Sequence, residues 1–153
     1  MKTEEKRIAQ RIVLGGVVIK EGRVLILQRH NDEAIYPNMW ELPSGKRENL
    51  ESSEVALVRE VREESGLDVE ALAPISTFDY QVERHDELHD STQINFLVRP
   101  INSKEVSLSN EHQAFAWAAP EEINNYDITD STKDVIRKAF EIILKLDLQN
   151  RGL

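Results

Sequence analysis

The sequence predicts an α/β fold in which a mixed β-sheet lies between helices, an α/β/α sandwich. Two observations carry this prediction. Short runs of β-branched and apolar residues recur along the chain, and two segments with helical periodicity stand in the middle and at the end. Strands and helices that are mixed in this way are typical of a sheet whose faces are covered by helices.

The length predicts one domain. The chain has 153 residues, and it contains no internal repeat, no low-complexity run and no linker rich in Gly, Pro or Ser. At 40% hydrophobic residues, it can bury a sizeable core. We therefore expect a single domain over residues 1–153, with its core at about residues 12–146.

Two strands open the fold. The runs "RIVLGGVVI" and "RVLILQR" are apolar and β-branched, and "KEGR" separates them as a turn that contains Gly22. They predict a hairpin or two neighbouring strands. The next stretch, "NDEAIYPNMWELPSGKREN", is expected to be irregular because Pro37, Pro43 and Gly45 interrupt it.

A helix is expected from about Ser52 to Ser65, ended by Gly66. In the second half, "DVEALAPISTFDYQVE" and "STQINFLVRPI" predict two strands joined by the polar loop "RHDELHD", and "QAFAWAA" predicts a further strand. Pro120 suits the first position of a short helix. The final segment, "TDSTKDVIRKAFEIILKLDL", predicts an amphipathic helix with a cluster of capping residues at its start.

Composition excludes several function classes. The chain has no cysteine, which rules out disulfides, thiolate catalysis and cysteine zinc sites. A formal net charge of −9 argues against a nucleic-acid polymer as the main partner, although a cation can bridge acidic residues to a small anionic ligand. The longest apolar run is too short to cross a membrane, and the charged start "MKTEEKRIAQR" does not resemble a signal peptide. A cytoplasmic protein fits these observations.

The mid-chain helix combines an apolar side with an acidic side. On a helical wheel, Glu60, Glu63 and Glu64 span an arc of roughly 100°. We expect Val55, Val58 and Val61, on the other side, to face the sheet. A solvated surface explains three such glutamates equally simply, because like-charge pairs on a helix cost only about 0.2–0.5 kcal/mol each. A site for Mg²⁺ or Mn²⁺ is the alternative, because these ions prefer oxygen ligands.

The sequence around these glutamates favours the metal site. From Gly45 to Leu67, the stretch "GKRENLESSEVALVREVREESGL" resembles the signature of the Nudix hydrolase family, G-x5-E-x7-R-E-U-x-E-E-x-G-U, where U is a bulky apolar residue. All nine constrained positions match within 23 residues. We therefore interpret the acidic side of the helix as part of a family site and not as a solvated surface.

The resemblance extends over most of residues 12–140. "GGVVIKEGRVLILQR" is similar to the first strand pair of the family, "WELPSGK" to the loop before the helix, and "EHQAFAWAAPEEI" to a late strand in which a loop Glu precedes a Trp, here Glu111 and Trp117. There are two departures. Ser44 stands where the family usually has Gly, and Leu50 stands where a Gly often precedes the first signature Glu. The first departure matters if Ser44 needs a positive φ angle.

The resemblance implies a metal-dependent hydrolase that attacks a nucleoside diphosphate linkage with water. It also implies roles for single residues. Arg59 orients Glu60, Glu51 contributes at most an outer-shell contact, and either Glu60 or Glu111 is the general base, with Glu60 preferred. The implied ligands of Mg²⁺ or Mn²⁺ are the carboxylates of Glu60, Glu63, Glu64 and Glu111 and the carbonyl oxygen of Ser44.

Four residues are candidates for substrate binding. Arg29 ends its strand where it can reach a phosphate, and Lys46 sits beside the signature; each is also explained as a surface cation. In MutT-like members of the family, a polar residue near the last helix reads the base, and the matching position here is Thr132 or its neighbour Asp130. Both are explained more simply as helix caps.

Other features have simpler explanations. Trp117 is expected to pack in the core, and His85 and His89 to lie in a solvated hairpin tip. Gly15 and Gly16 lack the Lys-Ser/Thr ending of a phosphate loop and instead indicate close packing within a strand.

Within the family, we expect a MutT-like pyrophosphohydrolase of nucleoside triphosphates, with an oxidised purine such as 8-oxo-dGTP among its candidate substrates. It would act on a small nucleotide as a monomer or homodimer. Two alternatives stay open. One is hydrolysis of ADP-ribose or another nucleoside diphosphate derivative, and the other is a catalytically silent domain that binds nucleotide or a protein partner. Every signature carboxylate is present, which argues against the silent domain.

Overall fold

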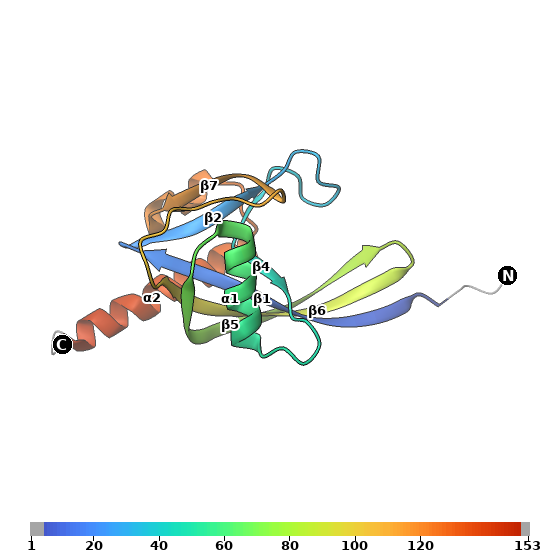
Figure 1. Ribbon diagram of the computed structural model, residues 1–153, viewed down its shortest axis with the longest axis horizontal. Coiled ribbons are helices and arrows are strands. Elements are labelled where there is room, and N and C mark those ends of the chain that lie inside the picture. The colour runs from blue at the N-terminus through green and yellow to red at the C-terminus, as the bar shows by residue number, and fades with distance from the viewer. Residues whose placement is uncertain (1–4, 151–153) are drawn as a thin grey trace.

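A computed structural model describes residues 5–150 of the chain. Its sheet has the strand order β3-β2-β1-β6-β5, with β4 paired to β1 and β7 paired to β2. Figure 1 shows this strongly twisted sheet with α1 crossing one side of it. The elements are β1 (Arg7–Lys20), β2 (Arg23–Arg29), β3 (Trp40–Glu41), β4 (Ser44–Lys46), α1 (Ser53–Ser65), β5 (Val69–Arg84), β6 (Glu87–Pro100), β7 (His112–Ala118), the 3₁₀-helix η1 (Pro120–Asn125) and α2 (Asp130–Asn150).

The sheet is mixed, and its two faces carry separate cores. β1 runs parallel to β6 and antiparallel to β2 and β4. Because side chains alternate along β1, Leu14 and Val18 join the core beneath α1, while Val17 joins the core beneath α2 with Ile136. The predicted arrangement of a mixed sheet between helices is confirmed.

α1 begins and ends where the sequence predicts. The Ser52 hydroxyl caps the helix by accepting a hydrogen bond of 3.2 Å from the Val55 amide, and Gly66 ends it with a φ of 73°. The expected packed side was wrong in part. Val55 is 58% exposed, whereas Leu57 and Val61 are fully buried. Val55 precedes Leu57 by roughly 200° of helical rotation, so the two cannot both face the sheet.

Two segments are more regular than the sequence indicates. The stretch around Pro43, expected to be irregular, contains the short strands β3 and β4, which pair with β2 and β1. The expected polar loop "RHDELHD" is mostly strand, because only a turn at His85 and Asp86 separates β5 from β6. Local polarity hid this strand because long-range pairing supplies its hydrogen bonds.

The extra length of these strands forms a projecting ribbon. Residues 7–12 of β1 pair with residues 87–92 of β6, which pair in turn with residues 79–84 of β5. We call this three-stranded ribbon the arm; it extends beyond β4 toward the N-terminal end of the chain in Figure 1. In the described part of the chain, no helix combines the length and the apolarity needed to cross a membrane.

Candidate active site

Arg59 organises the signature glutamates on α1. Its Nε and Nη2 atoms donate hydrogen bonds of 2.7 and 2.8 Å to the two carboxylate oxygens of Glu51, and Nη1 donates one of 2.8 Å to Glu60. Nη1 also lies 3.3 Å from both oxygens of Glu63. The bidentate pair with Arg59 lowers the pKa of Glu51 to about 2. Arg59 therefore holds the acidic side of α1 together in the metal-free protein.

Gly45 leaves the space that Glu60 occupies. A Cβ atom built on Gly45 would collide with the Glu60 carboxylate. Burial raises the pKa of Glu60, and the hydrogen bond from Arg59 opposes that shift. The signature glycine is thus required by close approach of β4 to α1 and not by a turn.

Glu64 turns inward and is the most buried acid of the site. Its side chain leaves the residue only 5% exposed, and one carboxylate oxygen accepts a hydrogen bond of 3.2 Å from the Ser44 amide. Burial, followed by the nearby carboxylates of Glu41, Glu111 and Glu60, raises the pKa of Glu64 to about 9, although the hydrogen bond from the Ser44 amide opposes the shift. The surroundings of this carboxylate therefore disfavour its charge.

The α1 carboxylates point in different directions in this structure, and their role as metal ligands stays a prediction. Within residues 5–150, no group of three or more His, Asp or Glu side chains is already placed to hold an ion. Glu63 is turned to Arg59 and Glu64 is turned to Ser44, so the repulsion is relieved by separation. The donors still fit a divalent cation, because they are hard carboxylate oxygens, one of them buried among like charges.

The two departures from the family pattern have different consequences. Ser44 has no positive φ, so a residue with a side chain fits its conformation. Leu50 has a φ of 64° and a fully exposed side chain, which is the left-handed conformation that favours glycine. The departure at Leu50 therefore costs backbone strain, whereas the departure at Ser44 does not.

A cleft of about 440 Å³ opens beside Glu64. It brings together five residues that the sequence predicts for the site: Arg29, Ser44, Glu64, Glu111 and Thr132. Its other walls come from the segment around β3, from β5 and from the start of α2, and they include the aromatic residues Tyr36, Trp40, Phe78 and Tyr80. Polar groups at one end and aromatic rings around them suit a phosphorylated compound with a planar ring.

Glu41 and His112 were missed at the sequence level. Glu41 Oε1 accepts a hydrogen bond of 3.3 Å from Arg29 Nη1. The same oxygen lies 2.8 Å from Nε2 of the buried His112. Arg29 also donates to the Ile35 carbonyl and contacts Glu33. The one available signal was the position of Glu41 in "WELPSGK", next to the signature. The pairing of Glu41 with His112, 71 residues away, could not be seen in the sequence.

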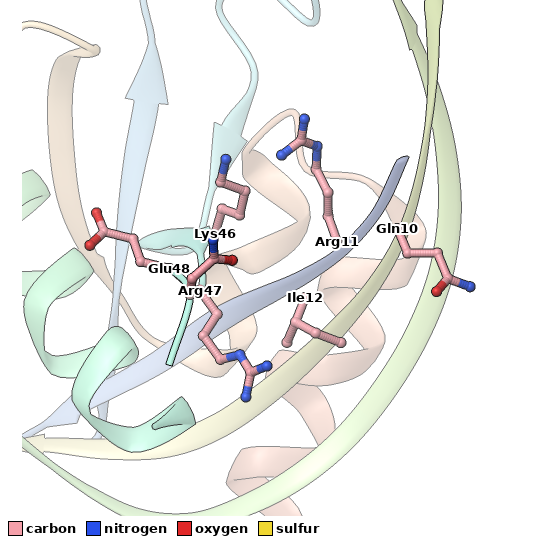
Figure 2. A pocket seen from close by; sticks show the side chains of 7 residues that line it. Gln10, Arg11, Ile12, Lys46, Arg47 and Glu48 are labelled. Atoms are coloured by element: carbon pink, nitrogen blue, oxygen red, sulfur yellow. The ribbon is translucent and has the colours of Figure 1, made fainter. Parts of the chain in front are cut away.

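Several predicted site residues lie outside the cleft wall. The hydrogen-bonded network on α1 contains Arg59, Glu60 and Glu63. It is joined to β4 because Arg59 donates a hydrogen bond to the Lys46 carbonyl. Lys46 lines a neighbouring groove, and Figure 2 shows its side chain extending to the same side as that of Arg11. Asp130 is exposed and does not line the cleft, so its suggested contact with the substrate stays a prediction. Thr129, and neither Thr132 nor Asp130, provides the cap, because its hydroxyl accepts a hydrogen bond from the Thr132 amide.

The features expected to be structural take those roles except at His89, whose expected place in a solvated hairpin tip was wrong because it lies within β6. Trp117 packs against the core beneath α1. Gly15 lies so close to Asn95 that an added Cβ atom would collide with it. His85 is exposed at the hairpin turn, whereas His89 is partly buried on the arm beside Arg11.

The fold and this site define a hydrolase of phosphorylated compounds built around a carboxylate helix. The sequence model of the NUDIX domain matches residues 9–139, and the chain belongs to the Nudix family. Nucleoside triphosphatase NudI of Escherichia coli O139:H28 (strain E24377A / ETEC) is 30% identical over 136 residues, which cover 84% of this chain and 95% of the relative. The chain is accordingly a Nudix hydrolase acting on a diphosphate linkage. Hydrolases of this family generally use divalent metals and act on small nucleotide substrates.

Solved structures agree in fold. A NUDIX-family hydrolase from Clostridium perfringens has a TM-score of 0.72 at 19% identity, covering 86% of this chain and 97% of that one. An ADP-ribose pyrophosphatase from Streptococcus suis 89-1591 has a TM-score of 0.68 at 20% identity, covering 86% and 90%. A MutT protein from Methanosarcina mazei Go1 has a TM-score of 0.64 at 23% identity, covering 97% and 99%. At these identities, the likeness concerns the fold alone.

Proposed function

We propose that the protein is a pyrophosphohydrolase of nucleoside triphosphates that releases nucleoside monophosphate and pyrophosphate with Mg²⁺ or Mn²⁺ bound. The observation that carries the proposal is the placement of the buried Glu64 carboxylate, in the field of Glu41, Glu60 and Glu111, at the wall of a 440 Å³ cleft. A buried acid beside a cleft whose pKa is raised to about 9 is typical of a functional site. The name of the NudI relative, a nucleoside triphosphatase, supports the choice of substrate class.

The residues proposed to hold the cation are Glu60, Glu63, Glu64, Glu111 and the Ser44 carbonyl. When bound, the cation would screen the polyphosphate charge and stabilise the charge that develops on the phosphoryl oxygens. Arg59 would keep Glu60 oriented, as its 2.8 Å hydrogen bond does in the metal-free protein. Arg29 and Glu41 would fix the cleft wall nearest the phosphates, because they are hydrogen-bonded to each other.

Two carboxylates are candidates for the base that takes the proton of the attacking water. Glu60 has a pKa raised by burial, which brings it closer to the operating pH of a general base. Glu111 lines the cleft directly and lies near enough to Glu64 to raise its pKa. We assign the base to Glu60. Replacing each residue by Gln separates them, because loss of the base lowers kcat and removes the acidic limb of the pH–rate profile.

The nucleoside would occupy the aromatic part of the cleft. Phe78 and Tyr80 lie on β5, and Trp40 is held edge-on against Tyr126 at a centroid distance of 5.0 Å. Rings placed in this way can contact a purine or a pyrimidine, so they do not select between them. We propose that Thr132 provides this selection. Its polar side chain lines the cleft, and the sequence also suggested it as a base reader.

The test is a panel of nucleotides incubated with Mg²⁺ or Mn²⁺, with product analysis. The panel contains the common ribo- and deoxyribonucleoside triphosphates, 8-oxo-dGTP and ADP-ribose. Monophosphate and pyrophosphate in equal amounts from a triphosphate support the proposal. Release of inorganic phosphate from triphosphates, or turnover of ADP-ribose alone, would replace it by the corresponding alternative. An inactive protein across the whole panel would support the catalytically silent domain.

A further inference from the structure

A second groove, next to the cleft, is lined by positive side chains of the arm. It has a volume of about 330 Å³, and Arg11, Lys46 and Arg84 line it together with His89. Tyr80, Val82 and Arg84 line both this groove and the nucleoside cleft, so the two spaces share one wall on β5. A substrate that extends along this wall can reach from one space into the other.

Strand register places these cations on one face of the sheet. Arg11 pairs with Ser91, and Ser91 pairs with Tyr80. Paired residues point to the same face, and residues two positions apart along a strand do so as well. Lys46, which pairs with Val13, and Arg84, four positions after Tyr80, therefore share the face of Arg11. Figure 2 shows the Lys46 and Arg11 side chains extending to one side, while that of Arg47 extends to the other.

The two faces of the arm differ in charge. Asp79, Glu83 and Asp90 alternate with the groove residues and so lie on the opposite face. On the groove face, Glu87 is the one acid that the register places among the cations of the arm. Although the net charge of the protein is −9, three cations line this groove, and the arm acids other than Glu87 lie on the opposite face.

These cations are poorly neutralised by the protein. Elsewhere, Arg62 lies 2.8 Å from Asp68 and Arg99 lies 2.8 Å from Glu70. Within residues 5–150, neither Lys46 nor Arg84 has a carboxylate within 4.0 Å, and Arg11 has one only at 3.9 Å. The Arg11 Nε atom is buried without a hydrogen-bond partner. Arg11 contacts His89 at 3.3 Å, so the weakly paired cations and the buried Nε donor leave hydrogen-bonding capacity that suits an anion.

We propose that Arg11 and Arg84, with Lys46, form a phosphate-binding subsite for the group of the substrate that lies beyond the hydrolysed linkage. The inference rests on the proposed function, because it assumes that a nucleotide enters through the shared β5 wall. Its consequence is a preference for substrates whose distal group carries phosphates, such as nucleoside triphosphates, over diphosphate derivatives whose distal group is an uncharged sugar. Arginine suits this role because its guanidinium binds phosphate oxygens in pairs.

The first measurement is substrate discrimination. We expect Arg84→Gln and Arg11→Gln each to lower the ratio of kcat/KM for a nucleoside triphosphate to kcat/KM for ADP-ribose by about tenfold, which is about 1.4 kcal/mol. Arg84→Lys should recover part of that ratio, because it keeps the charge. Arg99→Gln is the matched control, since Arg99 is an exposed β6 arginine paired with Glu70 outside the groove. An unchanged ratio in both groove variants would overturn the proposal.

The second measurement is independent of catalysis. Calorimetric titration with inorganic pyrophosphate in EDTA reports on the groove, because the metal-free carboxylates repel this anion. Wild-type protein should bind it, and Arg84→Gln and Arg11→Gln should bind it at least fivefold more weakly, with circular dichroism confirming the fold. Equal binding by wild type and variants would overturn the subsite. Should the nucleotide panel show no pyrophosphate release while these variants still lose pyrophosphate binding, the proposed function fails and the subsite stands.

Discussion

The carboxylate network on α1, which adjoins the cleft at Glu64, and the aromatic part of the cleft, where we propose that the nucleoside binds, are built in different ways; we call them the carboxylate end and the nucleoside end. The carboxylate end comes from one continuous segment, in which Arg59 binds Glu51 and Glu60 through hydrogen bonds of 2.7 to 2.8 Å. The nucleoside end is assembled from Trp40, Phe78 and Thr132, which lie on three elements far apart in the sequence. Its polar side chains come from β5, β6 and the start of α2.

The difference teaches which part of the function can vary independently. Within the carboxylate end, three residues depend on one another. Gly45 leaves the space that the Glu60 carboxylate occupies, and Arg59 holds that carboxylate through a hydrogen bond. At the nucleoside end, a side chain can change without disturbing such a network. We therefore expect changes at the carboxylate end to abolish chemistry, and changes at the nucleoside end to shift preference while chemistry continues.

The largest expected effect comes from Glu64→Gln. A neutral amide is a poor ligand for Mg²⁺, so kcat should fall by at least about 100-fold, or about 2.7 kcal/mol, at saturating Mg²⁺. The fold should survive, because the change removes a buried acid among like charges. Glu54→Gln, on the exposed first turn of the same helix, is the control and should keep full activity. Near-normal turnover in Glu64→Gln would show that this carboxylate does not hold the metal.

The same carboxyl group should make the metal-free protein less stable at high pH. Its pKa is about 9 in the folded protein and 4.5 in the reference state, so between these values the folded state binds more protons than the unfolded state. The free energy of unfolding therefore decreases as the pH rises from 5 to 9. The lowered pKa values of Glu51 and Asp68 act below this window.

Denaturant unfolding in EDTA at pH 5, 7 and 9 measures this dependence. Each unit of pKa difference corresponds to about 1.4 kcal/mol, so we expect the decrease to be smaller in Glu64→Gln than in wild type by about 2 kcal/mol or more. Saturating Mg²⁺ should reduce the decrease in wild type, because a bound cation favours the ionised carboxylate. Parallel pH profiles for wild type and variant would mean that Glu64 is not held in a charge-disfavouring environment.

The sequence predicts the carboxylate end of the site better than the nucleoside end. The limits of α1, the hydrogen bond from Arg59 to Glu60 and the mixed sheet could be predicted, because they depend on caps, helical spacing and a continuous signature. The assignment of metal and catalytic roles to single residues stays a prediction. The sequence could not show that Glu64 turns inward while Glu63 turns to Arg59, since side-chain direction on a helix depends on the neighbouring strand.

Features that depend on long-range pairing were missed. Val55 was expected to pack, although it faces solvent, because three valines at helical spacing do not reveal which side the sheet covers. Residues 84–90, at the tip of the arm, were expected to be a loop, because their charged side chains conceal strands that are paired only through distant partners. The cationic groove depends on that pairing and had no local signal at all.

A smaller effect is expected at Leu50, where the carboxylate end departs from its family pattern. Its left-handed backbone costs about 1 kcal/mol or more with a side chain, and its exposed side chain makes no compensating contact. Glycine loses more conformational entropy on folding than leucine, and this cost offsets part of the relieved strain. Leu50→Gly should therefore raise the free energy of unfolding by about 0.5–1 kcal/mol. Leu72→Gly, at a half-exposed β5 position with a negative φ, should lower it. A destabilised Leu50→Gly would show that the leucine makes a contribution other than strain.

The smallest expected effect is also the sharpest test of the nucleoside end. Thr132 lines the cleft, whereas Asp130 is exposed outside it, and both belong to the first turn of α2. We expect Thr132→Ala to change the ratio of kcat/KM between purine and pyrimidine triphosphates, or between 8-oxo-dGTP and dGTP, by about threefold to tenfold, because one hydrogen bond contributes about 0.5–1.5 kcal/mol.

Asp130→Ala serves as the matched control and should leave every such ratio unchanged. Thr129→Ala separates capping from recognition, because the Thr129 hydroxyl accepts the hydrogen bond that caps α2. Its loss should cost about 1 kcal/mol of stability without altering substrate preference. If Thr132→Ala lowers stability as Thr129→Ala does while all substrate ratios stay constant, Thr132 supports the helix and the base is read by another residue of the cleft. The next residues to test for base selection would then be the β5 side chains that line the cleft.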